Sequence, residues 1–406
     1  MLAGTLTGMT LGNFSGEWLI GGIEGKVFAY AAVFGAMACL MRRETALAAL
    51  WTGIAIAFHP VVGLWHLLAA GGTLGLMRFG PRGGNKEPGG LNLRPQTRFL
   101  YWGIALVFGL VGFLPAAALL VSVPEEVAYR GTEIQVYQRL AHHLNPLNFS
   151  VDAYRWYGGL TAAACVLWFL VPRTRAWRFC RLYVWWCVFF AVAGVIVGYF
   201  PRWFPGSSLD HLSPRLLKFY PFRMGDILLP WFVITAVPAA IMMSSGRVAA
   251  RRGFYELVLT VGLCGVLAGV VGPYRNQWYP VALSEREATD WLKMCQWVRL
   301  NAGEDALVLT TRKGWGFKWY AERAEYFSHK DAPQDAPGLI AWEGRQRLLW
   351  ELFSERFGRE DLIRFRKETG TDYAVLARGT PCDLSPIYEN GSFALYDLRT
   401  LGEGSR

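Results

Sequence analysis

The sequence predicts a mainly α-helical polytopic membrane protein of about eight transmembrane segments with a small C-terminal extracytoplasmic α/β domain. Of its 406 residues, 53% are hydrophobic and only 18% are charged, which is unusual for a soluble protein. Apolar stretches long enough to cross a bilayer, about 17–25 residues, recur along the first two thirds of the chain. Arginine gathers in alternate connections between them.

The positive charge orients these segments. Basic residues dominate the connections at 42–43, 78–98, 173–181 and 247–252, which contain almost no acid. The positive-inside rule assigns them to the cytoplasmic face. The net charge of +10 then indicates contact with membrane lipid headgroups, and no nucleic-acid partner is expected.

Apolar runs and the breakers between them place the segments at about residues 18–41, 46–58, 60–77, 99–121, 157–171, 182–199, 227–243 and 254–271. The second and third segments meet at His59–Pro60 and are short, so a re-entrant hairpin is the alternative. Residues 1–16 lack Lys and Arg. The chain therefore either starts on the outer side or lacks upstream helices.

From Ser284 onward the pattern becomes that of a globular domain. It predicts helices at 285–300, 339–357 and 359–368, and strands at 306–311, 326–329, 373–378, 387–388 and 393–398. Asn390-Gly391 favours a hairpin between the last two strands. Two domains are expected, a transmembrane domain at residues 1–272 and an extracytoplasmic α/β domain at residues 284–400.

Glu17, Glu24 and Lys26 precede or begin the first apolar run. A charge inside the membrane costs about 2.5–3.5 kcal/mol, so these residues are candidates for a carboxylate site at the outer mouth of a cavity. On one continuous helix the two glutamates would share a face, about 10 Å apart, and Lys26 would point elsewhere. The alternative is an interfacial turn whose charges reach lipid headgroups.

Histidines concentrate in the predicted outer connections. His59 precedes a helix start, and the loop around residues 129–146 holds Arg139, His142 and His143. These side chains can bind a phosphate by charge-assisted hydrogen bonds, bind a metal, or transfer protons. A helix lying on the membrane surface is the alternative for the loop.

A further cationic group precedes the segment at 227–243. Arg215, Lys218, Arg223 and Asp226 flank aromatic residues there and suit a lipid phosphate or an interfacial anchor. Motifs for a nucleotide-driven pump, a serine hydrolase or a HExxH metal site are absent from the sequence. No cofactor is indicated with certainty, and a divalent metal stays open.

Several of these segments resemble a group of uncharacterised bacterial polytopic membrane proteins related to the GT-C superfamily of lipid-dependent glycosyltransferases. The resemblance is carried by GIEGKVFAY at 22–30, FHP at 58–60, RLAHHLNP at 139–146, FYPFR at 219–223, and in the tail WVRLN at 297–301, DALVL at 305–309, GF at 316–317 and HKDAP at 329–333. In GT-C enzymes the acidic base lies in an outer loop after the first helix. Glu17 and Glu24 correspond to that base by position only.

The resemblance implies transfer of a sugar from a polyprenyl-phosphate donor to an envelope acceptor at the outer face of a bacterial inner membrane. Glu24 or Glu17 would be the base. The substrate-binding candidates are Lys26, His59, Arg139, His142, His143, Lys218 and Arg223, and the tail would help bind the acceptor. The alternatives are a transporter or flippase that uses Glu24, Lys26 and His59, or a non-catalytic envelope assembly protein. The oligomeric state is not predicted.

Overall fold

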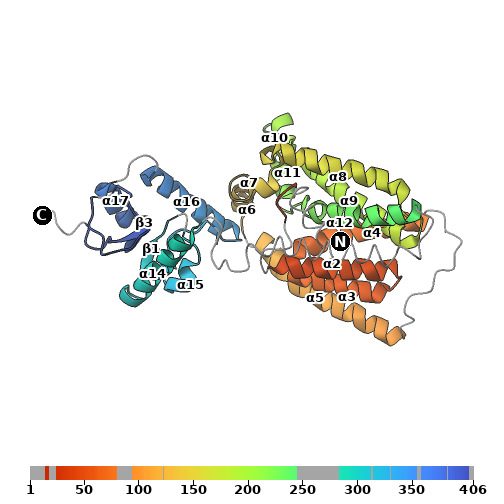
Figure 1. The fold of residues 1–406 in the computed structure, drawn as a ribbon, viewed down its shortest axis with the longest axis horizontal. Helices are drawn as coiled ribbons and strands as arrows, with labels where there is room; N and C mark the ends of the chain where they lie inside the picture. Colours follow the sequence, from red (N-terminus) through yellow and green to blue (C-terminus); the bar gives the residue numbers. More distant parts are fainter. Residues whose placement is uncertain are drawn as a thin grey trace. The chain divides into compact units, whose positions relative to one another are not determined.

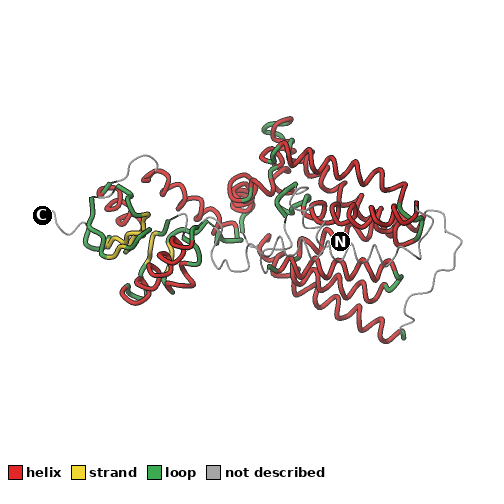
Figure 2. Tube along the Cα trace, viewed as in Figure 1, coloured by secondary structure: helices red, strands yellow, loops and turns green. Residues whose placement is uncertain are grey.

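The computed structural model describes residues 14–17, 24–79, 94–121, 123–244, 283–311, 314–329, 331–353, 358–381 and 383–401. The chain divides into two compact units, Met1–Val270 and Val271–Arg406. Helices make up most of the first unit, and the strands among these residues belong to the second (Figure 1 and Figure 2). The segment predicted at 254–271 lies outside the described residues.

The long helices of the first unit follow the predicted apolar runs. They are α2 (Gly25–Met41), α3 (Thr45–Phe58), α4 (Pro60–Phe79), α5 (Pro95–Val121), α8 (Val151–Leu170), α9 (Arg175–Gly198) and α12 (Arg223–Ser244). Helices α8 and α9 begin well before the residues that the apolar runs predict. Ser150 and Thr174 accept hydrogen bonds from the backbone N–H groups of Ala153 and Trp177 and so cap these starts.

Within the described residues, four helices are long and apolar enough to cross a membrane: Pro60–Arg78, Pro95–Leu119, Arg175–Trp203 and Arg223–Ala240. Gly25–Met41 and Thr45–Phe58 are shorter apolar helices. Along α5, large apolar side chains such as Phe99, Leu106 and Phe113 are exposed. An exposed apolar surface of this extent is typical of contact with lipid or with another protein.

Contacts distinguish the two ends of this helical unit. At one end the guanidinium of Arg181 donates to the carbonyl of Trp168 (2.7 Å), and Cys180 Sγ lies 3.5 Å from Met41 Sδ. The end of α2, the end of α8 and the start of α9 therefore meet there, beside the arginine-rich connections. The turn between α3 and α4 meets the start of α12 at the other end, because Arg223 contacts His59.

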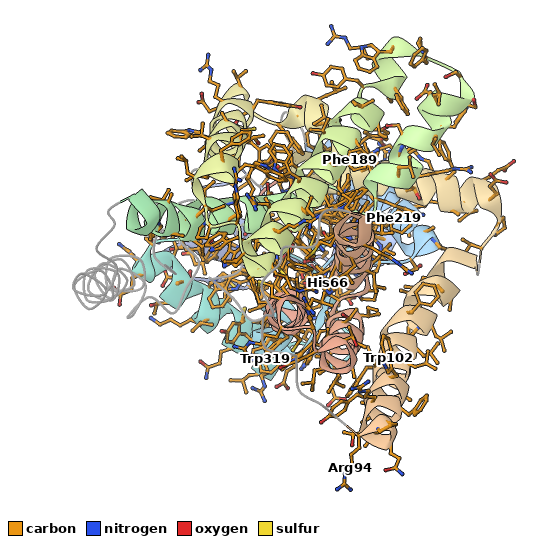
Figure 3. The ribbon with its side chains drawn as sticks, turned by 90° about the vertical axis from the view of Figure 1, so that its right-hand side faces the viewer. His66, Arg94, Trp102, Phe189, Phe219 and Trp319 are labelled. Carbon is orange, nitrogen blue, oxygen red and sulfur yellow. The ribbon has the colours of Figure 1, made fainter. Side chains whose placement is uncertain are left out.

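A buried histidine links α3, α4 and α9 inside this unit. Thr52 Oγ1 donates to the carbonyl of Ala48 (2.8 Å), so it accepts from His66 Nε2 (3.2 Å). His66 Nδ1 then accepts from the hydroxyl of Tyr183 (2.6 Å). Figure 3 shows His66 among the helices, whereas Trp102 lies on α5 and Arg94 just before its start. This network satisfies polar groups between helices and gives His66 a structural role.

Among the described residues, short helices fill two long connections of the first unit. Residues 123–150 form α6 (Glu125–Glu133), a π-helix η1 (Ile134–Arg139), α7 (Ala141–Leu144) and a 3₁₀ turn η2 (Pro146–Asn148). Residues 200–217 form α10 (Phe200–Trp203) and α11 (Ser208–Leu217). A single π-helical turn often marks a functional position, and this one ends at Arg139.

The second unit contains a five-stranded sheet of order β2-β1-β3-β5-β4. Its elements are α14 (Glu285–Asn301), β1 (Leu307–Leu309), α15 (Phe317–Ala321), β2 (Ala324–Glu325), α16 (Ala336–Phe353), α17 (Arg359–Thr369), β3 (Tyr373–Ala377), β4 (Tyr388–Glu389) and β5 (Phe393–Asp397). The first three strands in this order are parallel, and β5 runs antiparallel to β3 and β4.

Alternate residues of β1 and β3 face two different apolar clusters. Val308 and Val375 pack with Trp291 of α14 and Phe317 of α15. Leu309 and Ala374 pack with Phe365 of α17 and Leu352 of α16, on the other face. The predicted hairpin is confirmed, because β4 and β5 pair with Glu389 opposite Ala394. The strand predicted at 326–329 was wrong, since β2 is Ala324–Glu325.

Candidate functional site

The carboxylate of Asp226 holds the segment 14–17. Asp226 lies in the first turn of α12 and is 0% exposed. Its Oδ1 accepts from the backbone N–H of Phe14 (2.8 Å), and its Oδ2 accepts from the backbone N–H (2.8 Å) and hydroxyl (2.7 Å) of Ser15 and from the backbone N–H of Glu17 (3.3 Å). Residues separated by more than 200 positions in the sequence are thereby joined.

The side chain of Glu17 lies between two cations. Its Oε2 accepts from Arg223 Nε at 2.9 Å, and its Oε1 lies 3.7 Å from Lys26 Nζ. The Glu17 side chain is 5% exposed and that of Arg223 is 8% exposed. Burial raises the pKa of Glu17, and the charges of Arg223 and Lys26 oppose the rise.

His59, in the turn between α3 and α4, completes a charged cluster with Glu17, Lys26 and Arg223. Arg223 Nη1 lies 2.7 Å from His59 Nε2. A guanidinium can only donate, so Nε2 accepts from Arg223, and the backbone N–H of Val62 lies 3.4 Å from Nδ1. Burial and the charge of Arg223 lower the pKa of His59 from 6.5 to about 3. His59 therefore orients Arg223 as a neutral ring at physiological pH.

Three aromatic residues contact Arg223 or the segment that precedes it. The hydroxyl of Tyr30 on α2 donates to the carbonyl of Arg223 (2.9 Å), and Trp65 Nε1 on α4 donates to the carbonyl of Phe219 (2.6 Å). The Arg223 guanidinium stacks on the ring of Tyr220, 4.0 Å from its centre. Tyr220 has φ +56°, a strained conformation for a non-glycine residue, and such strain is often found at functional sites.

Glu24 lies at the edge of the cluster. It is the N-cap residue of α2 in an extended conformation, and its side chain is 50% exposed. Lys26 Nζ lies 3.2 Å from Glu24 Oε2 and also contacts Glu17. The two glutamates do not share one continuous helix, because the backbone of Glu24 is extended. Glu17 and Glu24 both precede the helix, and Lys26 lies between their carboxylates.

The two loop histidines occupy different environments. His143 Nδ1 contacts the carbonyl of Ser15, which can only accept, so Nδ1 carries the proton. Burial lowers the pKa of His143, which keeps the ring neutral near pH 7. The rings of His142 and His143 lie 4.0 Å apart, and His142 is exposed. His143 therefore belongs to the cluster around segment 14–17, and His142 lies beside it.

Arg139 and Lys218 lie beside the charged cluster rather than within it. Arg139 Nη1 donates to Gln135 Oε1 at 3.0 Å. Burial raises the pKa of Tyr220, and the nearby charges of Arg223 and Arg139 oppose the rise. Lys218 Nζ lies 5.5 Å from the centre of the Phe219 ring. Two guanidinium groups thus lie near one phenol, an arrangement that suits an anionic ligand.

The cluster offers carboxylates and cations for acid–base chemistry and for binding a phosphate. Among the described residues, no three His, Cys, Asp or Glu side chains gather so that they could hold a metal ion. Of the described partners of Arg223, Glu17 and His59 bind Nε and Nη1. Its remaining nitrogen, Nη2, makes no hydrogen bond within the described ranges and can donate to a ligand.

Sequence reasoning selected Glu17, Glu24, Lys26, His59 and Arg223, which the structure brings together. It did not assign a role to the hydroxyl of Ser15, which looks like an ordinary loop residue. The closest available signal was Asp226, an acid at the start of an apolar run that was grouped with its basic neighbours only. Tyr220 was among the aromatic residues of the predicted interfacial anchor, and Tyr30 gave no separate signal.

Comparison with protein families gives a match in the C-terminal unit. A family described as a domain of unknown function (DUF6798) matches residues 289–349. In the structure these residues run from α14 through β1, α15 and β2 into α16, all within the second unit. No curated protein matches the chain. The matched family lies within the C-terminal α/β unit and leaves the charged cluster of the helical unit to be interpreted from its geometry.

Proposed function

We propose that this chain is an integral membrane GT-C-like glycosyltransferase. It would move a sugar, a hexose or a pentose, from a polyprenyl-phosphate donor to an envelope acceptor at the outer face of the bacterial inner membrane. The observation that carries the proposal is the convergence of Glu17, Glu24, Lys26, His59 and Arg223 at one end of the helical unit. A lipid-linked substrate requires a polar site beside apolar helices, and the cluster meets that requirement.

Glu24 is the proposed general base. Its carboxylate is half-exposed and, among described residues, contacts only Lys26, so one oxygen can reach an acceptor hydroxyl. Glu17 is too enclosed for that role, because it is buried between Arg223 and Lys26. We therefore assign Glu17 to orienting Arg223. A general base at the right position typically contributes about 10²–10⁴-fold to the rate.

Arg223 is the proposed ligand of the donor phosphate, through its Nη2. Arg139, Lys218 and the His142–His143 pair would add donors as the leaving phosphate gains charge. His59 would hold the guanidinium in place through its 2.7 Å contact with Nη1. A transporter that passes protons through His59 is less favoured, because a ring with a pKa of about 3 stays neutral across the physiological range.

The proposal includes the topology. The Arg-rich connections would face the cytoplasm, about eight segments would cross the membrane, and the C-terminal unit would lie outside. The test is labelling of single cysteines at His142 and Arg43, in a variant without the native cysteines, by a thiol reagent that does not cross membranes. Intact cells should be labelled at 142 and not at 43. The reverse pattern would contradict the orientation.

The catalytic proposal is tested by Glu24→Gln in purified protein with a polyprenyl-phosphate sugar donor. We expect transfer to fall by at least about 10²-fold while donor binding is retained. Glu44→Gln is the matched control, because Glu44 also precedes an apolar helix as its N-cap. Undiminished transfer by Glu24→Gln would remove Glu24 from the role of base. Donor movement across vesicles without sugar transfer would favour a flippase.

A further inference from the structure

We infer that Asp226 is a positioning residue of the charged cluster, which holds Glu17 in place through the backbone of segment 14–17. The inference rests on the proposed function only for its kinetic readout. Among the described residues, the carboxylate of Asp226 makes hydrogen bonds to that segment alone, four in number and none longer than 3.3 Å. A fully buried carboxylate with all its partners on one short segment fixes that segment's position.

The backbone of segment 14–17 is arranged to bind a carboxylate. Backbone N–H groups of Phe14, Ser15 and Glu17 point at the same two oxygens, as in the anion-binding concavities formed by consecutive N–H groups. Gly16 has φ +77°, and a Cβ there would lie 2.7 Å from His143. Gly16 is therefore required by both the backbone conformation and the space beneath the imidazole.

Two residues in one turn of α12 bind Glu17. Arg223 and Asp226 are three residues apart and lie on the same side of the helix. Arg223 binds the side chain of Glu17, and Asp226 binds its backbone N–H. Phe14 anchors the other end of the segment, because its ring packs against Phe149 (5.0 Å) and Tyr157 (4.7 Å). The carboxylate of Glu17 is thereby placed where it can orient Arg223.

Hydrogen–deuterium exchange of the full chain in micelles tests this placement without any activity assay. In Asp226→Asn, the amides of residues 14–17 should exchange at least tenfold faster, while peptides from α9 and α14 keep their rates. Ser15→Ala removes only the hydroxyl bond and should give a smaller increase. It also serves as the test if Asp226→Asn does not fold. Asp152→Asn, at an exposed position, is the control and should change nothing.

The kinetic readout separates positioning from general destabilisation. If Asp226 acts through Glu17 on Arg223, Asp226→Asn raises the donor KM at least tenfold and leaves the acid limb of the pH profile unchanged. A folded variant with unchanged exchange at residues 14–17 would overturn the inference, as would a lower kcat with an unaltered donor KM. Absence of sugar transfer in the unmodified protein would reject the proposed function and leave the exchange result standing.

Discussion

The pairing of Glu17 with Arg223 predicts a strong energetic coupling between two residues 206 positions apart. The perturbation is a double-mutant cycle of Glu17→Gln, Arg223→Gln and the double variant. Both side chains are almost completely buried, at 5% and 8% exposure. Removing one partner of a buried pair leaves the other as an uncompensated charge, which costs about 3–5 kcal/mol.

The two single variants should differ. Glu17→Gln should lose about 3 kcal/mol of unfolding free energy, because Arg223 keeps His59 and the Tyr220 ring. Arg223→Gln should lose about 4 kcal/mol, because the stacking on Tyr220 is lost as well. Lys26, 3.7 Å from Glu17, offsets part of the second loss. The double variant should lose about 4 kcal/mol rather than the sum, which gives a coupling of about 3 kcal/mol.

The assay is denaturant unfolding in detergent micelles, followed by the fluorescence of the 18 tryptophans. The control cycle uses Asp152 and Arg155, an ion pair of 3.1 Å whose side chains are 76% and 75% exposed. Its coupling should stay below about 1 kcal/mol, as measured for surface pairs generally. If the losses at Glu17 and Arg223 add to within about 0.5 kcal/mol, the two residues are independent and the reasoning is refuted.

Three further outcomes are expected. Burial and the charge of Arg223 lower the pKa of His59 from 6.5 to about 3. Between these two pH values only the unfolded chain binds the proton. The free energy of unfolding should therefore fall by up to about 1.4 kcal/mol for each unit by which the pH drops from 6.5 toward 3. A His59→Gln variant that keeps this slope would contradict it. Gly198→Ala places a Cβ 2.0 Å from Pro146 Cγ and should lower stability by about 1–3 kcal/mol in a thermal melt, whereas Gly158→Ala meets nothing within 4 Å and should be neutral or stabilising. Asn390→Ala loses its bonds to the Asp290 carbonyl and to the N–H groups of Ser392 and Phe393, and should destabilise the C-terminal unit by about 2 kcal/mol in urea, with no change for the exposed Asn301→Ala.

Much of the helical layout could be predicted because apolar run length is set by the thickness of a membrane. Helix ends were less predictable. Ser150 and Thr174 extend α8 and α9 beyond their apolar runs, since capping depends on a single hydroxyl group. Helix α2 begins at Gly25 and not near Trp18, and the approach of Gly25 to the Phe58 carbonyl is a tertiary contact that composition does not reveal.

The members of the charged cluster could be selected, but not their partners. Glu17, Lys26, His59 and Arg223 were found because ionisable groups beside apolar runs are costly. Which cation meets which carboxylate depends on how α2, α4 and α12 pack, and the Glu17–Arg223 and His59–Arg223 contacts span 206 and 164 residues of sequence. In the C-terminal unit, Asn390-Gly391 identified a hairpin because the turn is local, whereas the short β2 depends on pairing with β1.

The strand order of the C-terminal unit affects how its matched family segment can be studied. Residues 289–349 contain β1 and β2 but end before β3, which pairs with β1 on its other side. A peptide of residues 289–349 would leave one hydrogen-bonding edge of β1 unpaired and would expose Val308 and Leu309. An exposed apolar strand edge of this kind promotes aggregation. Residues 283–401 include every strand of the sheet and are the better choice for expression of this part by itself.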